Sequence, residues 1–402
     1  MYNECPCGIT GPKGFYAAGV HCGVKKVKKD LALVYSTAPA RGAGVFTTNR
    51  VPAAPVLIDK QQLERSSSFR AILVNSGNAN ACTGERGFND ALAMVTAAAD
   101  ELKIGRTEVL ISSTGVIGQY LPMEKIQAGV AEAAVMLDAG GHTSAAEAIM
   151  TTDKFTKELA VRVNLDGVDV TIGGMAKGSG MIAPNMATML AFITTDCNIS
   201  SELLGYSLKQ AADHSFNRIS VDGDTSTNDM VLMLANGLAG NKELTSVHDP
   251  SFVLFYDALQ YLLTRLSKMI VMDGEGATKF VEIRVTDAAS EEAAVQAARS
   301  IANSNLVKTA INGEDANWGR ILAAVGYSGI EFIPEDVEIF FDDVPILRKN
   351  YSIDFSEEAA KRVLQQKEIK ITVDLDQGSS SASFWTCDLS KEYVAINANY
   401  RT

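Results

Sequence analysis

One stretch of the sequence combines a cluster of glycines, a single lysine and a threonine that follows a small residue. It spans residues 171–196, and Lys177 lies among the glycines. Glycines let a backbone approach a ligand closely, because they carry no side chain. A Pro-Asn pair then predicts a turn, and a mostly apolar run starts at Ala187 and Thr188. We therefore expect a strand, a glycine-rich loop and a second strand.

Thr188 could act as a nucleophile if a base lay beside its hydroxyl. Its own α-amine can be that base once the preceding peptide bond is cut. A strained loop could favour attack of the Thr188 hydroxyl on the Ala187 carbonyl, giving an ester that water then opens. The small Ala187 side chain would not obstruct that attack. From residue type alone, a threonine that starts a strand is more often structural, because β-branched residues favour strands.

The same stretch resembles the signature of the ornithine acetyltransferase family, the self-cleaving glutamate N-acetyltransferases of arginine biosynthesis. Four more stretches are similar to that family and follow its order along the chain. They are Thr-Thr-Asn at 47–49, Ser-Thr-Gly-Val-Ile-Gly at 113–118, Asp-Gly-Glu-Gly-Ala-Thr-Lys at 273–279 and Ile-Asn-Ala-Asn-Tyr-Arg-Thr at 396–402. A resemblance that runs from one end of the chain to the other is far more specific than a single motif.

The resemblance implies an α/β fold with helix-covered sheets and an N-terminal-nucleophile-like architecture. It implies self-cleavage between Ala187 and Thr188 into an alpha chain, 1–187, and a beta chain, 188–402. Two copies of each would form a heterotetramer. It further implies ping-pong transfer of the acetyl group of N-acetylornithine to glutamate through acetyl-Thr188. Whether acetyl-CoA is also a donor stays open, as does an N-terminal-threonine amidase or aminopeptidase that passes the acyl group to water.

The resemblance also assigns roles to individual residues, with no cofactor. Thr188 is the nucleophile, and Thr114 with Gly115 forms the oxyanion hole. Other polar residues match substrate contacts, with the choice between Thr151 and Thr152 open by one position. The expected substrate-binding residues are Thr151, Lys177, Thr188, Glu275, Asn397 and Thr402. By charge, Lys177 suits a substrate carboxylate and Glu275 suits an ammonium group such as that of ornithine.

Composition narrows the classes of function. The chain has 402 residues, a formal charge of −12 and 47% apolar residues, which is ordinary for a globular protein with a large core. The negative charge argues against a nucleic-acid partner. No apolar run approaches a membrane span, and the first residues lack the features of a secretion signal. We therefore expect a cytosolic protein whose six cysteines are free thiols. That its substrates are small molecules is what the resemblance implies.

Three other site types are weaker alternatives. Cys5, Cys7, His21 and Cys22 suggest zinc, but the Cys-x-Cys spacing is tighter than usual. Residues 222–229 resemble a calcium loop in composition and lack its terminal glutamate. The glycines at 178–183 fit a loose dinucleotide pattern, which would need a helix to follow.

Short β-prone runs alternate with Ala- and Leu-rich helical periods, which indicates an α/β or α+β architecture. Strands are expected at 31–37, 43–48, 55–59, 71–75, 108–112, 158–163, 168–172, 187–193, 230–236, 279–286, 336–340, 369–375, 382–387 and 392–397. Helices are expected at 88–103, 123–137, 143–150, 201–213, 250–268, 290–303 and 318–326. Because the expected cleavage lies between two strands of one motif, both fragments should share a sheet and a core.

Overall fold

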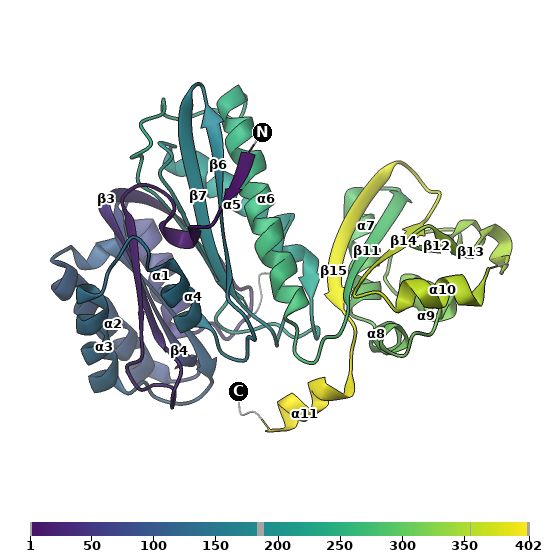
Figure 1. Ribbon diagram of the computed structural model, residues 1–402, viewed down its shortest axis with the longest axis horizontal. Helices are drawn as coiled ribbons and strands as arrows, with labels where there is room; N and C mark the ends of the chain where they lie inside the picture. Colours follow the sequence, from purple (N-terminus) through teal and green to yellow (C-terminus); the bar gives the residue numbers. More distant parts are fainter. Residues whose placement is uncertain (1, 183–188, 354, 400–402) are drawn as a thin grey trace. The chain divides into compact units, whose positions relative to one another are not determined.

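The computed structural model describes residues 2–182, 189–353 and 355–399, and the chain divides into two compact units. Unit 1 comprises Met1–Asn217 and Asp224–Ile270, and unit 2 comprises Arg218–Gly223 and Val271–Arg401. Each unit has its own sheet and its own hydrophobic core (Figure 1).

Unit 1 is built on a nine-stranded sheet. Its strands are β1 (Tyr2–Cys5), β2 (Phe15–Val20), β3 (Leu31–Phe46), β4 (Phe69–Asn78), β5 (Val109–Val116), β6 (Lys157–Leu165), β7 (Val168–Lys177), β8 (Leu190–Thr195) and β10 (Met230–Ala235). Their order across the sheet is β1-β6-β7-β8-β10-β3-β4-β5, and β2 pairs with β3 off this path. β7 and β8 form an antiparallel pair, and β8 runs parallel to β10. Both strands that follow Thr188 therefore pair with strands that precede it.

The sheet of unit 1 is buried on both faces. Along β3, Ala32 and Val34 point into one hydrophobic cluster, and Leu31 and Leu33 point into another. This alternation follows from the two-residue period of a strand. Helices close both sides, with α2 and α3 on one face of β3 and β4 and α4 on the other (Figure 1). The helices of this unit are α1 (Ala54–Arg65), α2 (Gly84–Leu102), α3 (Met123–Val135), α4 (His142–Ile149), α5 (Ser201–Asp213) and α6 (Pro250–Met272).

Unit 2 packs helices on a six-stranded sheet. Its strands are β9 (Ile219–Ser220), β11 (Phe280–Ala288), β12 (Glu338–Phe341), β13 (Val344–Leu347), β14 (Glu368–Asp374) and β15 (Ser380–Cys387), in the order β13-β12-β14-β11-β15-β9. Its helices are α7 (Glu291–Ala302), α8 (Asn305–Asn312), α9 (Trp318–Gly326), α10 (Glu357–Leu364) and α11 (Lys391–Asn399). In β11, Val281, Ile283 and Val285 are buried and Arg284 is exposed, so one face of the strand forms the core.

Most helices of unit 2 have a polar N-cap residue. The caps of α7, α8, α9 and α10 each accept a backbone N–H from the first turn, which satisfies a donor that has no partner within the helix. These caps are Ser290, Ser304, Asn317 and Ser356. Short 3-10 turns complete the two units, at η1 (Gly8–Thr10), η2 (Arg106–Glu108), η3 (Phe216–Arg218), η4 (Pro334–Asp336) and η5 (Lys349–Tyr351).

The expected mixed α/β fold with helix-covered sheets is confirmed, but two expected strands are helices. Residues 55–59 lie in α1, where Pro55 stands at the first turn and is compatible with a helix start. Residues 392–397 lie in α11. Both are short apolar runs whose periodicity cannot distinguish a strand from a helix. α8 and α10 were not expected, and neither were β1, β2, β9 and β13.

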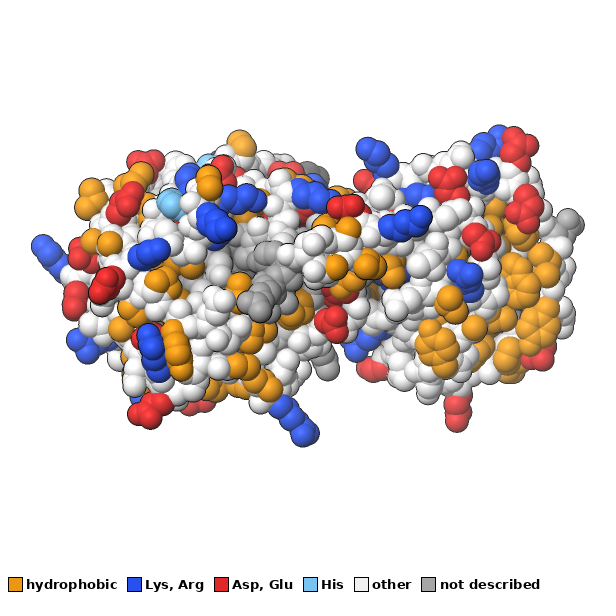
Figure 2. Space-filling model, turned by 90° about the horizontal axis from the view of Figure 1, so that it is seen from below, with side chains coloured by type: hydrophobic (Ala, Val, Ile, Leu, Met, Phe, Trp, Pro, Cys, Tyr) orange, Lys and Arg blue, Asp and Glu red, His pale blue; other side chains and the backbone are white. Residues whose placement is uncertain are grey.

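The face drawn in Figure 2 has no large patch of only acidic or only basic side chains. Acidic and basic side chains are interspersed on both units, and hydrophobic side chains gather on part of unit 2 (Figure 2). Within the described part of the chain, no helix combines the length and the apolar character needed to cross a membrane.

Candidate active site

The β7–β8 hairpin positions the stretch that carries the expected chemistry. Lys177, the last residue of β7, pairs with Leu190, the first residue of β8. β7 therefore includes Gly173 and Gly174, the first half of the glycine cluster that the sequence suggested was a loop. Gly173 lies so close to η1 that a Cβ atom there would be 2.1 Å from the Gly8 carbonyl oxygen, so only glycine fits. Ala187 and Thr188 lie between these strands and outside the described residues, as does Thr402.

Asp153 ties the base of this hairpin to the segment after α4. Its carboxylate accepts the backbone N–H of Thr151 at 2.8 Å, the backbone N–H of Gly178 at 2.7 Å and the Lys157 ammonium at 2.7 Å. Asp153 and Lys157 are both fully buried at their side chains. Burial acts to raise the pKa of Asp153, but the charges of Lys177 and Lys157 outweigh it and hold that pKa well below its ordinary value.

Lys177 is buried, with 4% of its surface exposed. Its charge acts on Asp153 and on Asp229, the residue just before β10. An isolated lysine among glycines is often solvated, whereas this lysine ends the strand β7. A cation held in this way is preorganised to meet an anionic ligand group, because little side-chain freedom remains to be lost.

Asp229 contacts the chain immediately after the expected nucleophile. Its carboxyl group accepts the backbone N–H groups of Met189 and Ser226, and the Met230 N–H donates to the Met189 carbonyl at 3.3 Å. Its Oδ2 atom has no hydrogen-bond partner among the described residues. Burial raises the pKa of Asp229 well above its ordinary value, and the charge of Lys177 opposes that rise. From the sequence, Asp229 is notable only as part of the segment 222–229, which resembles a calcium loop in composition.

Thr114 and Gly115 end β5, beside β4. Gly115 has φ +131°, and a Cβ atom there would be 2.3 Å from the Gly77 carbonyl carbon, so the position requires glycine. Asn228, which directly precedes Asp229, connects this end of β5 to the segment before β10. Its amide donates to the Ser113 carbonyl at 2.8 Å and to the Ala79 carbonyl at 2.6 Å.

The Thr-Thr-Asn stretch at 47–49 supports the same segment. The Thr47 N–H donates to the Asp229 carbonyl at 2.9 Å, and its hydroxyl donates to the Ser226 carbonyl at 2.8 Å. Asn49 donates to the Thr225 carbonyl at 3.1 Å. These hydrogen bonds fix the backbone of residues 225–229, whose last residue, Asp229, contacts Met189.

Thr151 and Thr152 differ in their contacts. The Thr152 hydroxyl forms a 2.7 Å hydrogen bond with the hydroxyl of Ser179, in the loop that follows Lys177. Thr151 contacts Asp153 through its backbone N–H. The side chain of Thr152 therefore holds this loop.

Unit 2 brings together Glu275 and Asn397. The amide of Asn397, on α11, donates to Glu275 Oε2 at 2.8 Å, and Glu275 is 7% exposed. Asp388 fixes the end of the 273–279 stretch by accepting both backbone N–H groups of Thr278 and Lys279 at 2.8 and 2.9 Å. This stretch is therefore shaped by hydrogen bonds that its composition alone did not reveal.

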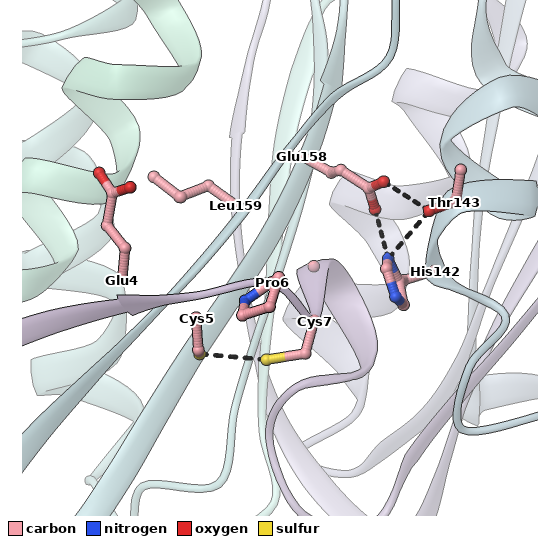
Figure 3. Close-up of a pocket in the computed structure, with 9 residues that line it drawn as sticks. Glu4, Cys5, Pro6, Cys7, His142, Thr143, Glu158 and Leu159 are labelled. Carbon is pink, nitrogen blue, oxygen red and sulfur yellow. Dashed lines mark hydrogen bonds and ion pairs between the residues drawn. The ribbon is translucent and has the colours of Figure 1, made fainter.

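The weaker site types gain no support. A cavity of about 540 Å3 is lined by Cys5, Cys7, His142, Thr143 and Glu158 (Figure 3). His142 and Thr143 both bond to Glu158, and the Cys7 thiol lies 3.1 Å from the Cys5 sulfur. Burial, with the neighbouring Cys5, raises the pKa of Cys7 to about 12, whereas a metal ligand must be a thiolate.

Two further findings bear on these alternatives. Among residues 2–182, 189–353 and 355–399, no three His, Cys, Asp or Glu side chains are grouped so that they could hold a metal ion. The next element described after the glycines at 178–182 is the strand β8, and a dinucleotide-binding turn would lead into a helix.

Comparison with known proteins identifies the family. A model of the ArgJ family matches residues 16–402. The arginine biosynthesis bifunctional protein ArgJ of Oceanobacillus iheyensis is 49% identical over 395 residues, which cover 98% of this chain and 96% of that protein. The protein of the same name from Symbiobacterium thermophilum is 51% identical over 400 residues, which cover 98% of each chain.

Solved structures give a shorter match. The ornithine acetyltransferase of Mycobacterium tuberculosis, solved in complex with ornithine, is 43% identical, with a TM-score of 0.43. The match covers 46% of this chain and 98% of that one.

The sequence matches place this protein in the class of arginine-biosynthesis acyltransferases. The chain belongs to the ArgJ family. The resemblance drawn from the sequence alone is thereby confirmed.

Proposed function

We propose that this protein cleaves itself between Ala187 and Thr188 and then transfers the acetyl group of N-acetylornithine to glutamate through acetyl-Thr188. The observation that carries the proposal is the placement of Lys177. This buried cation pairs across the hairpin with Leu190, two residues after Thr188. This placement supports a role for Lys177 in binding the α-carboxylate that both amino-acid substrates carry.

Self-cleavage needs no group from outside the chain except water. The Thr188 hydroxyl oxygen attacks the carbonyl carbon of Ala187, and the C–N bond breaks as the ester forms and the α-amine of Thr188 takes a proton. Water then hydrolyses the ester, which leaves a carboxylate on Ala187 and restores the hydroxyl. Met189 is fixed by the Asp229 carboxyl group, which limits movement of the chain just after the bond that breaks.

Acetyl transfer then proceeds in two half-reactions. The freed α-amine accepts the hydroxyl proton as Thr188 attacks the acetyl carbonyl of N-acetylornithine, and ornithine leaves with that proton on its amine. The amine of glutamate next attacks acetyl-Thr188, and N-acetylglutamate leaves as the hydroxyl is restored. The Thr114 hydroxyl and the Gly115 N–H donate to the oxyanion in each step.

Charge sets the orientation of the substrates. We assign Lys177 and Thr151 to the α-carboxylate that donor and acceptor share. Glu275, Asn397 and Thr402 complete the proposed set, and the Glu275 carboxylate suits the ornithine ammonium. The Asn397 amide is already bonded to Glu275, which supports a shared role for these two side chains.

The test is an assay of where the acetyl group goes. Purified protein with N-acetylornithine and glutamate should form N-acetylglutamate and ornithine in equal amounts, with parallel lines in double-reciprocal plots. Acetate release that glutamate does not suppress would favour the amidase alternative and reject the proposal. Replacing N-acetylornithine by acetyl-CoA in the same assay tests the second donor.

Thr114→Ala should lower kcat by about 100- to 1000-fold, because one donor to the oxyanion is lost. Thr114→Ser keeps the hydroxyl and is the matched control, expected to stay within about tenfold of wild type by the same argument. Both variants should fold normally, since Thr114 is only half-buried at the end of β5. Equal turnover of the alanine variant and wild type would remove Thr114 from the oxyanion hole.

A further inference from the structure

Lys25 differs from the other lysines of its basic cluster. Four lysines stand at positions 25, 26, 28 and 29; Lys26 and Lys28 are exposed, whereas Lys25 is half-buried in a loop built around Asp30, which is fully buried. The Asp30 carboxylate accepts the backbone N–H groups of Cys22, Gly23 and Lys25 at 2.6, 3.1 and 2.8 Å. Three such bonds fix the loop and therefore the direction in which Lys25 leaves it.

The Lys25 side chain extends from β4, the strand beside Thr114 and Gly115, toward Thr151. Its stem covers Gly77, where a Cβ atom would be 2.8 Å from Lys25 Cγ, and Gly77 is the strand partner of Gly115. Its ammonium donates to the carbonyl of Met150 at 2.7 Å, immediately before Thr151. Lys25 thus spans the interval between two of the proposed site positions.

Lys25 interacts electrostatically with Lys177 and with Asp153, one of the carboxyl groups on which Lys177 acts. Burial lowers the pKa of Lys25 to about 8, and the positive charges of Lys28 and Lys177 contribute to the decrease. Asp30 and Asp153 act in the opposite direction. Further titratable groups at this loop are His21, which bonds to the Lys25 carbonyl at 2.9 Å, and Lys125, which bonds to the Gly23 carbonyl at 3.0 Å.

We propose that Lys25 is a further substrate-binding residue, which with Lys177 forms a two-cation site for the α-carboxylate of the amino-acid substrates. Lys25 is half-buried, Lys177 is buried and their positive charges repel, so an anion that binds both lysines would stabilise them. The ligand class is an α-amino or α-acylamino acid with a free carboxylate. The inference rests on the proposed acetyl transfer and adds a second recognition group to it.

The sharpest test pairs a change in the protein with a change in the substrate. Lys25→Met, which keeps the length of the stem, should lower kcat/KM for N-acetylornithine by about 10- to 100-fold, the range for one charged hydrogen bond. The same variant should change kcat/KM for N-acetylornithine amide, which has no carboxylate, by less than about threefold, since no charged partner is lost. Lys26→Met, in the same loop and exposed, is the control and should match wild type with both substrates.

Equal losses with the acid and the amide would overturn the inference, because a structural role of Lys25 affects both substrates alike. Full activity of Lys25→Met with the acid would overturn it as well. Failure of acetyl transfer in wild type would instead reject the proposed function. The two ideas therefore fail on different measurements.

A pH measurement keeps the inference testable if Lys25→Met does not fold. A lysine with a pKa near 8 is charged below pH 8 and neutral above it, so carboxylate binding should weaken as the pH rises through 8. Ornithine binding to wild type at pH 8 should take up a fraction of a proton, measured by calorimetry in two buffers. Lys25→Arg stays charged and should bind without that uptake. Identical uptake in both proteins would contradict the role of Lys25.

Discussion

Thr188→Ala should be recovered as a single uncut chain with no acetyl transfer, whereas wild type separates into fragments 1–187 and 188–402 under denaturing conditions. Without the hydroxyl, the Ala187 carbonyl meets no nucleophile, and no acetyl carrier remains. Loss of such a nucleophile typically costs about 10⁴-fold or more in rate. Electrophoresis, intact mass and the two-substrate assay measure both effects.

Thr188→Ser is the matched control for this prediction. Serine keeps the hydroxyl that attacks and loses only a methyl group, so the chain should still be cut, at a rate that can be followed. Under native conditions the wild-type fragments should stay together, because β8 pairs with β7 and β10 pairs with β3. Processing of the alanine variant at the wild-type site would show that Thr188 is not the attacking group.

Asp153→Asn should destabilise the protein by about 3–5 kcal/mol, the cost of breaking a buried ion pair. The substitution keeps the size of the side chain and leaves the Lys157 ammonium, which is fully buried, without its carboxylate. It also weakens the bonds that hold Thr151 and Gly178, so substrate affinity should fall together with stability. Denaturant unfolding followed by circular dichroism measures the loss.

Asp213→Asn is the matched control for Asp153→Asn. Lys209 and Asp213 are also four residues apart, at 2.8 Å, but they lie at the surface, where a pair contributes about 0.5 kcal/mol. Equal losses in the two variants would contradict the role assigned to burial.

The role of Asp153 also predicts how the free energy of unfolding depends on pH. The pKa of Asp153 lies below its unfolded value of about 3.9, so its contribution is complete above that pH and is lost as the pH falls toward the folded value. Wild type should therefore lose stability relative to Asp153→Asn below about pH 4. A constant difference between the two proteins from pH 7 to pH 3 would contradict this.

The sequence was sufficient for the fold class and for most strands and helices, because long periodic segments such as α2 and α6 specify their own structure. It failed at residues 55–59 and 392–397, where a short apolar run fits either element and only packing decides. It linked Thr114 and Lys177 to one site only through the family resemblance, because β5 and β7 are not neighbours in the sheet.

Other residues of the candidate site could not be predicted from the sequence, because their contacts depend on how the strands pair. Asp153 follows two threonines, and its contacts with Lys157 and Gly178 depend on how β6 and β7 pair. Asp229 and Lys25 meet the site through strand order, since β10 lies beside β8 and β4 lies beside β5. Lys25 also illustrates that a run of like charges need not share one environment.

The most direct test of the central claim is the mass and N-terminal sequence of purified wild-type protein before and after incubation with N-acetylornithine alone. We predict two fragments, the second beginning at Thr188, and a mass gain of one acetyl group on that fragment, located at the Thr188 hydroxyl and removed by glutamate. An active protein in which Ala187 and Thr188 remain joined, or in which the acetyl group resides on another residue, would contradict it.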